Sequence, residues 1–252
     1  MSSLDGIFSP ARGLATGGSD RRCIREHLLT SSRYIQTPNF ARCHDSDLRI
    51  LFDQYDDRFF DRQLSDVLRH HASFPLPLKF TGRLRSSGGR TTRTRDRRAG
   101  TYRFAIDISH NVLFQNFRTP EETATVVGLK CLDRVDAMMR VMEHELIHLA
   151  EFLAFGESSC ARHRFQHAAH ALFGHTAHQH AMVTRRQKTI QNTPFRPGHR
   201  VRFTHDGQPL TGTVNRINTR ATVLVENPKG TRYTDGKRYL KFYVPVTGLL
   251  PL

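Results

Sequence analysis

Apolar residues recur at helical spacing in the stretch "DSDLRILFDQYDDRFFDRQL". Residues three and four positions apart share one face of an α-helix, so the pattern predicts an amphipathic helix with Asp45 or Ser46 as its N-cap. Its apolar positions are Leu48, Leu51, Phe52, Tyr55, Phe59 and Phe60. Residues 1–45 are rich in Ser, Gly, Arg and Pro and show no sustained period. We therefore expect a basic leader that is mostly disordered, with a short helix around "RRCIREHLL".

Two stretches between residues 74 and 114 have the pattern of extended chain. Prolines punctuate "FPLPLKFTGRL", which predicts an extended segment. The stretch "TYRFAIDISHNVLF" places Phe104, Ile106 and Ile108 on one face and predicts a strand. Between them, "RSSGGRTTRTRDRRAG" contains paired glycines, which predict a turn or a long hairpin loop.

Helical spacing returns in "EETATVVGLKCLDRVDAMMRVMEHELIHLAEFLAFG", residues 121–156, which predicts a long helix that ends at Gly156. A further helix is predicted from about Arg162 to Phe173. After "TPFRPG" the chain contains short β-branched and aromatic runs separated by Gly, Asn and Asp, which is typical of a small all-β module of about five strands.

The pattern as a whole predicts an α+β protein. We expect a disordered basic leader over residues 1–45, an α+β domain over 46–182, a linker over 183–197 and a small β-barrel module over 198–250. A chain of 252 residues is long enough for this division.

The sequence "HELIH" lies inside the long predicted helix and carries the candidate chemistry. A helix turns once every ~3.6 residues, so His144 and His148 point to one side and can bind one metal ion. Glu145 would lie beside a zinc ion, where its carboxylate can take a proton from bound water and pass it to a leaving amine. The alternative is an ordinary amphipathic helix that happens to carry histidines. A third protein ligand is required, and spacing alone leaves open which downstream residue supplies it: Cys160, His163, His167, His170, His175, His178 or His180.

Over about residues 47–180 the chain resembles the SprT-like (Spartan-type) zinc metalloprotease family, which includes a protease of DNA–protein crosslinks. The resemblance lies in "LFDQYDDRFFDRQLSD", "LPLKFTGRLRSSGGRT", "FAIDISHNVLF", "HELIH" and "RFQHAAHALFGH". It implies a zincin fold with His144 and His148 as zinc ligands and Glu145 as the general base. It also implies that the substrates are proteins bound or crosslinked to DNA.

The third ligand is where the chain departs from the family pattern. The family histidine stands four residues before an aromatic, and that position is Ala161 here. We favour the neighbouring Cys160, because a thiolate is a good zinc ligand, over His163 and His175. A thiolate donates charge, so it would lower the Lewis acidity of the metal. The zinc ribbon found at the C-terminal end of Spartan-type proteins is replaced by the predicted all-β module.

The net positive charge of the chain further predicts a nucleic-acid partner. The chain carries 38 Lys and Arg against 23 acids, a formal net charge of +15, and 32 of the 38 cations are arginine. Such an excess of positive charge favours contact with phosphate backbones, which the arginine guanidinium binds in a bidentate way. The alternative is that a genome rich in arginine codons produces the same composition. The densest run, residues 82–98, has one acid and seven arginines that we predict to contact nucleic acid: Arg83, Arg85, Arg90, Arg93, Arg95, Arg97 and Arg98. From Arg196 onward ten cations and three acids are interleaved with tyrosines, which either stack on bases or fill the core of the module.

The remaining composition limits the setting. No run approaches the ~20 apolar residues of a membrane span, and no signal pattern opens the chain. The four cysteines match no disulfide framework and no paired-cysteine zinc ribbon, so we expect a cytoplasmic protein, which would be nucleoid-associated if it binds DNA. The sequence therefore predicts a zinc endopeptidase that acts on DNA-bound proteins. The alternative is a non-proteolytic nucleic-acid-binding protein with a structural zinc site.

Overall fold

The computed structural model describes residues 4–9, 18–71, 74–119, 121–179 and 182–252. The chain forms two compact units, Met1–Met182 and Val183–Leu252, each with its own apolar core. Seven α-helices and three sheets lie in the described residues, which confirms a mixed α+β chain. None of the described helices combines the length and apolarity needed to cross a membrane.

The N-terminal leader differs from the expected disorder in the part that the structure describes. Residues Asp5–Phe8 form a 3-10 turn and Gly18–Ser31 form α1. Ile24 and Leu28, four residues apart on one face of α1, are fully buried in the core of the first unit. Arg25 also donates two hydrogen bonds to the Asp133 carboxylate, at 2.9 and 2.8 Å. These long-range contacts hold the helix in place, and no local pattern signals them.

Helix α2 follows the predicted spacing, with one difference at its start, whereas α3 was not predicted as a separate helix. Helix α2 covers Asp45–Phe60 and α3 covers Gln63–His70. The N-cap of α2 is His44 rather than Asp45 or Ser46, because the His44 ring accepts from the Ser46 N–H while Asp47 accepts from the His44 N–H at 2.7 Å. The reciprocal pair satisfies backbone donors that the first helical turn leaves free.

A three-stranded sheet carries the predicted extended segments in the order β1-β3-β2. Strand β1 covers Leu78–Thr81, β2 covers Gly89–Asp96 and β3 covers Thr101–Ser109. Strand β1 is parallel to β3, and β2 is antiparallel to β3. The arginine-rich run that was expected to be a turn or a long hairpin loop is therefore largely an edge strand. Helix α4, His110–Gln115, follows β3 directly.

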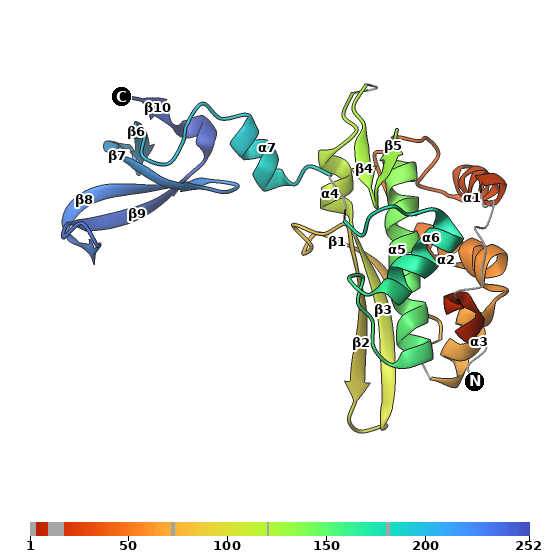
Figure 1. The fold of residues 1–252 in the computed structure, drawn as a ribbon. Coiled ribbons are helices and arrows are strands. Elements are labelled where there is room, and N and C mark those ends of the chain that lie inside the picture. Colours follow the sequence, from red (N-terminus) through yellow and green to blue (C-terminus); the bar gives the residue numbers. More distant parts are fainter. Residues whose placement is uncertain (1–3, 10–17, 72–73, 120, 180–181) are drawn as a thin grey trace. The chain divides into compact units, whose positions relative to one another are not determined.

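The long helix predicted from residue 121 is shorter. Residues Ala124–Val126 form β4 and Leu129–Cys131 form β5, an antiparallel hairpin, before α5 begins at Arg134 and runs to Phe155. Gly128 turns this hairpin at a φ of +82°, a backbone region that favours glycine, and the Asp133 side chain caps α5 by accepting from the Asp136 N–H. Helix α6, His163–Phe173, follows as predicted (Figure 1).

The second unit is an open sheet rather than the expected barrel. Its five strands pair in the order β10-β6-β7-β8-β9, and the two edge strands do not pair with each other. The strands are β6 Arg200–His205, β7 Gln208–Ile217, β8 Ala221–Arg232, β9 Arg238–Val244 and β10 Leu250–Pro251. The span expected to be a linker contains α7, Arg185–Gln191, and Ile190 of α7 packs on the core of the second unit.

Candidate metal centre

Three predicted ligands come together beside helix α5. His144 and His148 lie one turn apart, and their Nε2 atoms are 3.2 Å from each other. Cys160 comes from the segment between α5 and α6, and the ligand atoms of the three residues all lie within 4.8 Å of one another. The group can hold a metal ion. No fourth His, Cys, Asp or Glu joins this group among the described residues.

Buried Glu151 organises the segment that brings Cys160 back to α5. After Gly156 ends α5 at a φ of +71°, Ser158 donates to Glu151 Oε2 at 2.6 Å and the Ser159 N–H donates to the same oxygen at 3.1 Å. Arg164 of α6 donates to the other oxygen at 2.9 Å. Sequence reasoning did not find Glu151. Its only signal is an acid at a helix position whose neighbours are apolar.

The same contacts set the proton on His148. The Ser158 hydroxyl has one hydrogen, which it donates to the Glu151 carboxylate, so its oxygen accepts from His148 Nδ1 at 2.7 Å. The proton of a neutral His148 is then on Nδ1, and the Nε2 lone pair faces the ligand group. Burial lowers the pKa of His148 to about 4, although nearby Glu151 acts in the opposite direction. A neutral imidazole in this tautomer is the form that binds a metal ion, so the donor set fits one.

Cys160 lies in a less favourable charge environment when no cation is present. Burial raises the pKa of its thiol, and the negative charges of Glu145 and Glu151 raise it further. A divalent cation between the three ligands would reverse that balance, because it stabilises the thiolate directly. The Phe165 ring packs on both imidazoles, with centroids 4.9 Å from His144 and 4.5 Å from His148, and covers the group on one side.

The other candidate third ligands do not join this group among the described residues, although His178 lines a cavity that His144 also lines. His163 is exposed at the start of α6, where its ring stacks on His167. His175 is buried, and its Nε2 lies 2.9 Å from the carboxylate of Glu143. His180 is outside the described residues. The structure therefore brings Cys160 to the two helical histidines and keeps His163 and His175 out of the group.

Glu145 is held against strand β2. The Thr91 hydroxyl lies 2.7 Å from Glu145 Oε2 and 2.9 Å from the Glu145 backbone carbonyl. Burial raises the pKa of Glu145 to about 7, although the Thr91 contacts lower it in part. Neither Thr91 nor any other contact of Glu145 could be inferred from the sequence, because 54 residues separate the two along the chain.

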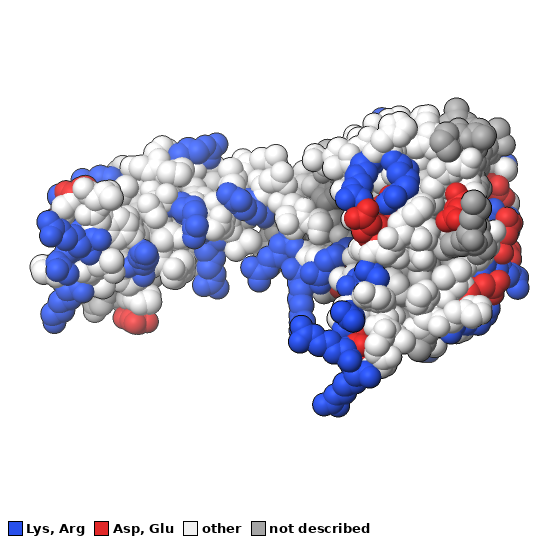
Figure 2. All heavy atoms as spheres, turned by 60° about the horizontal axis from the view of Figure 1, so that its bottom comes forward, with Lys and Arg blue, Asp and Glu red and all other residues white. Residues whose placement is uncertain are grey.

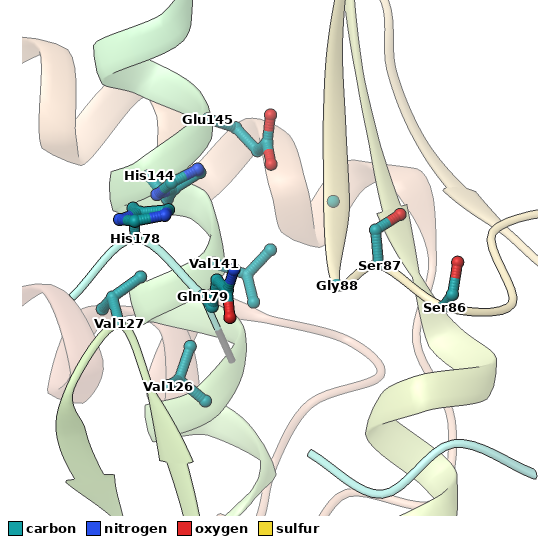
Figure 3. A pocket seen from close by; sticks show the side chains of 11 residues that line it. Ser86, Ser87, Gly88, Val126, Val127, Val141, His144, Glu145, His178 and Gln179 are labelled. Carbon is teal, nitrogen blue, oxygen red and sulfur yellow. The ribbon is translucent and has the colours of Figure 1, made fainter. Parts of the chain in front are cut away.

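Glu145 and His144 both line a cavity of about 320 Å³. Figure 3 shows Glu145 and Val141 of α5 on one side of this cavity, and Ser87 and Gly88 before β2 on the other. The β4–β5 hairpin and the segment after α6 complete the lining, with Val126, Val127, His178 and Gln179. One candidate ligand, His144, and the candidate base Glu145 thus face a space large enough for part of a substrate.

Strand β2 offers an open edge beside this cavity. The Ser109 N–H donates to the Gly88 carbonyl at 2.7 Å, so by antiparallel alternation the backbone groups of Gly89 and Thr91 point away from β3. No described strand pairs with that edge. An extended peptide could therefore add to the sheet next to Glu145.

A side chain at Gly89 would disturb the base. A Cβ added there would lie 2.7 Å from Glu145 Oε1 and 2.8 Å from a methyl group of Val141, closer than atoms pack. We expect Gly89→Ala to displace the Glu145 carboxylate and to lower the predicted peptidase activity about tenfold or more, with metal content unchanged. Gly100→Ala, in the β2–β3 turn, is the control for an added methyl in this hairpin, although its φ of +69° will reduce stability slightly. Equal activity of Gly89→Ala and the wild type would show that Glu145 does not need the space that the missing side chain of Gly89 leaves.

The seven predicted nucleic-acid arginines separate into two groups. Arg93 is structural, since it donates to the Gly156 carbonyl at 2.5 Å and lies over the Tyr102 ring at 3.4 Å. Arg90 pairs with Asp107 at 3.3 Å but keeps more than half of its side chain exposed. The other five are exposed: Arg83, Arg85, Arg95, Arg97 and Arg98.

No family model, curated protein or solved structure matches the chain. The resemblance to SprT-like proteases therefore stays a prediction, and the case for function depends on the site itself.

Proposed function

We propose that the protein is a zinc-dependent endopeptidase of the SprT-like type, which hydrolyses proteins bound or crosslinked to DNA. The observation that carries the proposal is the convergence of His144, His148 and Cys160 beside a cavity that Glu145 also lines. Two imidazoles and one thiolate suit zinc, and three protein ligands leave a position open for water, as in catalytic sites. A structural zinc site, which the alternative function requires, normally has four protein ligands.

Each residue of the site has a part in hydrolysis. When bound, zinc would supply a Lewis acid and lower the pKa of a water molecule towards ~7. Glu145 would accept the proton of that water and deliver it to the leaving amine. Thr91 holds Oε2 of Glu145, which keeps the carboxylate aimed across the cavity. Phe165 shields the ligands from bulk water on its side.

The substrate would bind as an added strand. Backbone groups of Gly89 and Thr91 would pair with an extended peptide, so binding would depend on the substrate's main chain more than on its side chains. The valines of the β4–β5 hairpin give the cavity an apolar wall. A protease of this kind needs another source of selectivity, and location on DNA is such a source.

Contact with DNA would come from the β2–β3 hairpin in the first unit. Its exposed arginines lie on and beside the strand whose edge faces the cavity. Arginine side chains of this kind bind phosphate without reading sequence. A protein attached to DNA would then be held within reach of the site.

Removal and return of zinc tests the proposal. The full chain, loaded with zinc, is expected to cleave a flexible protein such as casein, more rapidly with DNA present. A zinc chelator should abolish cleavage, and zinc added back after its removal should restore it, with fragments followed on gels. Activity that survives complete chelation, or a zinc-loaded chain that cleaves nothing with or without DNA, would contradict the proposal. The second result would favour the non-proteolytic binding protein.

A further inference from the structure

One face of the five-stranded sheet in the second unit is open and basic. Strand pairing places Arg200 opposite Thr213, Thr213 opposite Leu224, and Leu224 opposite Lys241, in one row across four strands. Directly opposed residues point to the same face of a sheet. We call this the outer face. Its exposed cationic and tyrosine side chains are Arg200, Arg202, Arg216, Lys241 and Tyr243.

The opposite face carries the apolar core of the unit. Val201, Phe203, Val214 and Val223 alternate with the outer residues and are buried. Helix α7 packs on that inner side through Ile190. Among the charged side chains of the second unit that Figure 2 shows, Lys and Arg predominate over Asp and Glu.

The central strand of the outer face carries side chains that are nearly buried, and longer side chains lie on either side of them. The row Arg216, Thr222 and Tyr243 lies next to the row that ends at Lys241. Thr222 and Leu224 of the central strand expose only 6 % and 9 % of their surface, whereas Tyr243 exposes 63 %. A tyrosine this exposed, beside a row of cations, contributes little to the core. Its ring is free to stack on a planar group.

Aromatic and cationic groups also meet at the β8–β9 end of the sheet. The Lys241 ammonium lies 5.5 Å from the centre of the Tyr233 ring, and Tyr233 packs edge-on against Tyr239. Tyr233 and Lys241 line an open groove of about 670 Å³ together with Asn215, Thr231, Arg232 and Thr234. No acid lines the groove, and Glu226 nearby is neutralised by Lys237 at 2.8 Å.

We propose that the outer face binds single-stranded nucleic acid. Bases would stack on Tyr243 while Arg200, Arg202 and Lys241 contact phosphates, the combination by which proteins hold single strands without reading sequence. A duplex fits less well, because its bases are already stacked and its major groove admits a helix or a two-stranded ribbon rather than a broad sheet. The inference deepens the nucleic-acid part of the proposed function, and hydrolysis has no role in it.

Binding by the full chain tests the inference. We use fluorescein-labelled oligothymidine of about 20 nucleotides, an oligouridine of the same length and a matched duplex, with fluorescence anisotropy as the readout. Tyr243→Ala is expected to weaken oligothymidine binding about tenfold, and Tyr243→Phe, which keeps the ring, by less than about twofold. Both should leave duplex affinity unchanged, because the β2–β3 hairpin supplies that contact. The oligouridine shows whether the same face accepts RNA.

A matched pair of cation variants distinguishes binding by the outer face from a general effect of positive charge. Lys241→Ala should weaken single-strand binding and flatten its salt dependence between about 50 and 200 mM. Arg186→Ala is the control, because Arg186 is exposed on α7, which covers the inner side. Thermal melting of each variant checks that the fold is kept. Equal losses for Lys241→Ala and Arg186→Ala would overturn the inference.

Three other results would also overturn the inference. They are single-strand affinity unaffected by Tyr243→Ala, equal loss for single strand and duplex, and displacement of oligothymidine by polyglutamate at equal charge. Glu145→Gln should bind oligothymidine like the wild type. Binding that depends on Tyr243 in a chain that cleaves no protein would support this inference and contradict only the proposed protease.

Discussion

Glu145→Gln is expected to lower the rate of peptide hydrolysis about 10²- to 10⁴-fold, the range that a positioned general base contributes. The amide keeps the size of the carboxylate and can still contact the Thr91 hydroxyl, but it cannot accept a proton from water. Glu145 is not one of the three residues whose ligand atoms converge, so zinc content should stay that of the wild type. Activity on casein and metal analysis of the same preparation measure both effects.

The comparison with Glu157→Gln makes this result specific. Glu157 is an exposed acid at the end of α5 that pairs with Arg162, outside the cavity. Its amide variant should retain both activity and zinc. A Glu145→Gln protein that cleaves casein at the wild-type rate would remove Glu145 from the mechanism. Loss of zinc together with activity would mean that Glu145 is needed for zinc binding rather than for proton transfer.

Cys160→Ala is expected to weaken zinc binding by more than about 100-fold, because loss of an outer-shell partner alone already costs 10- to 100-fold. The variant leaves two imidazoles on one helical turn, which is too few for a stable catalytic site. Competition with a fluorescent chelator measures the affinity, and thermal melting with and without zinc measures the lost stabilisation of the folded state.

Two further cysteine variants show whether the loss is specific. Cys23→Ala removes an exposed cysteine on α1 and should leave zinc affinity unchanged. Cys160→His replaces the sulfur ligand with a nitrogen ligand and should recover part of the zinc affinity that Cys160→Ala loses. The bound zinc should then be a stronger Lewis acid than with a thiolate ligand. Unchanged zinc affinity in Cys160→Ala would show that another residue completes the site, and His178, which lines the same cavity as His144, would be the first to test.

Residues near one another in sequence account for most of what could be predicted. Helical spacing predicted the start of α2 and both ends of α6 to within a residue or two, and it placed His144 and His148 on one side of α5 with Glu145 next to them. The alternation of Phe104, Ile106 and Ile108 predicted β3. These features depend on local backbone geometry, whose period appears in the sequence as the spacing of apolar residues.

Most of the predictions that were wrong depend on contacts between distant residues. The helix expected from residue 121 gives way to a hairpin, because Val126 and Cys131 are buried in the core and Gly128 provides the turn. The expected barrel is an open sheet, since closure depends on whether β10 and β9 meet. Residues 18–31 form a packed helix, since Ile24 and Leu28 find a partner surface in the core.

The sequence by itself determined the positions of the two candidate helical ligands and the candidate base, because one turn of helix sets their relation. Only the tertiary structure decided which residue joins them as the third candidate ligand and what surrounds Glu145. Cys160 reaches the histidines because buried Glu151 gathers Ser158, Ser159 and Arg164 around it, and Glu145 is oriented by a threonine on another strand. Such contacts form when the whole chain buries its apolar surface, so no spacing along the chain reveals them.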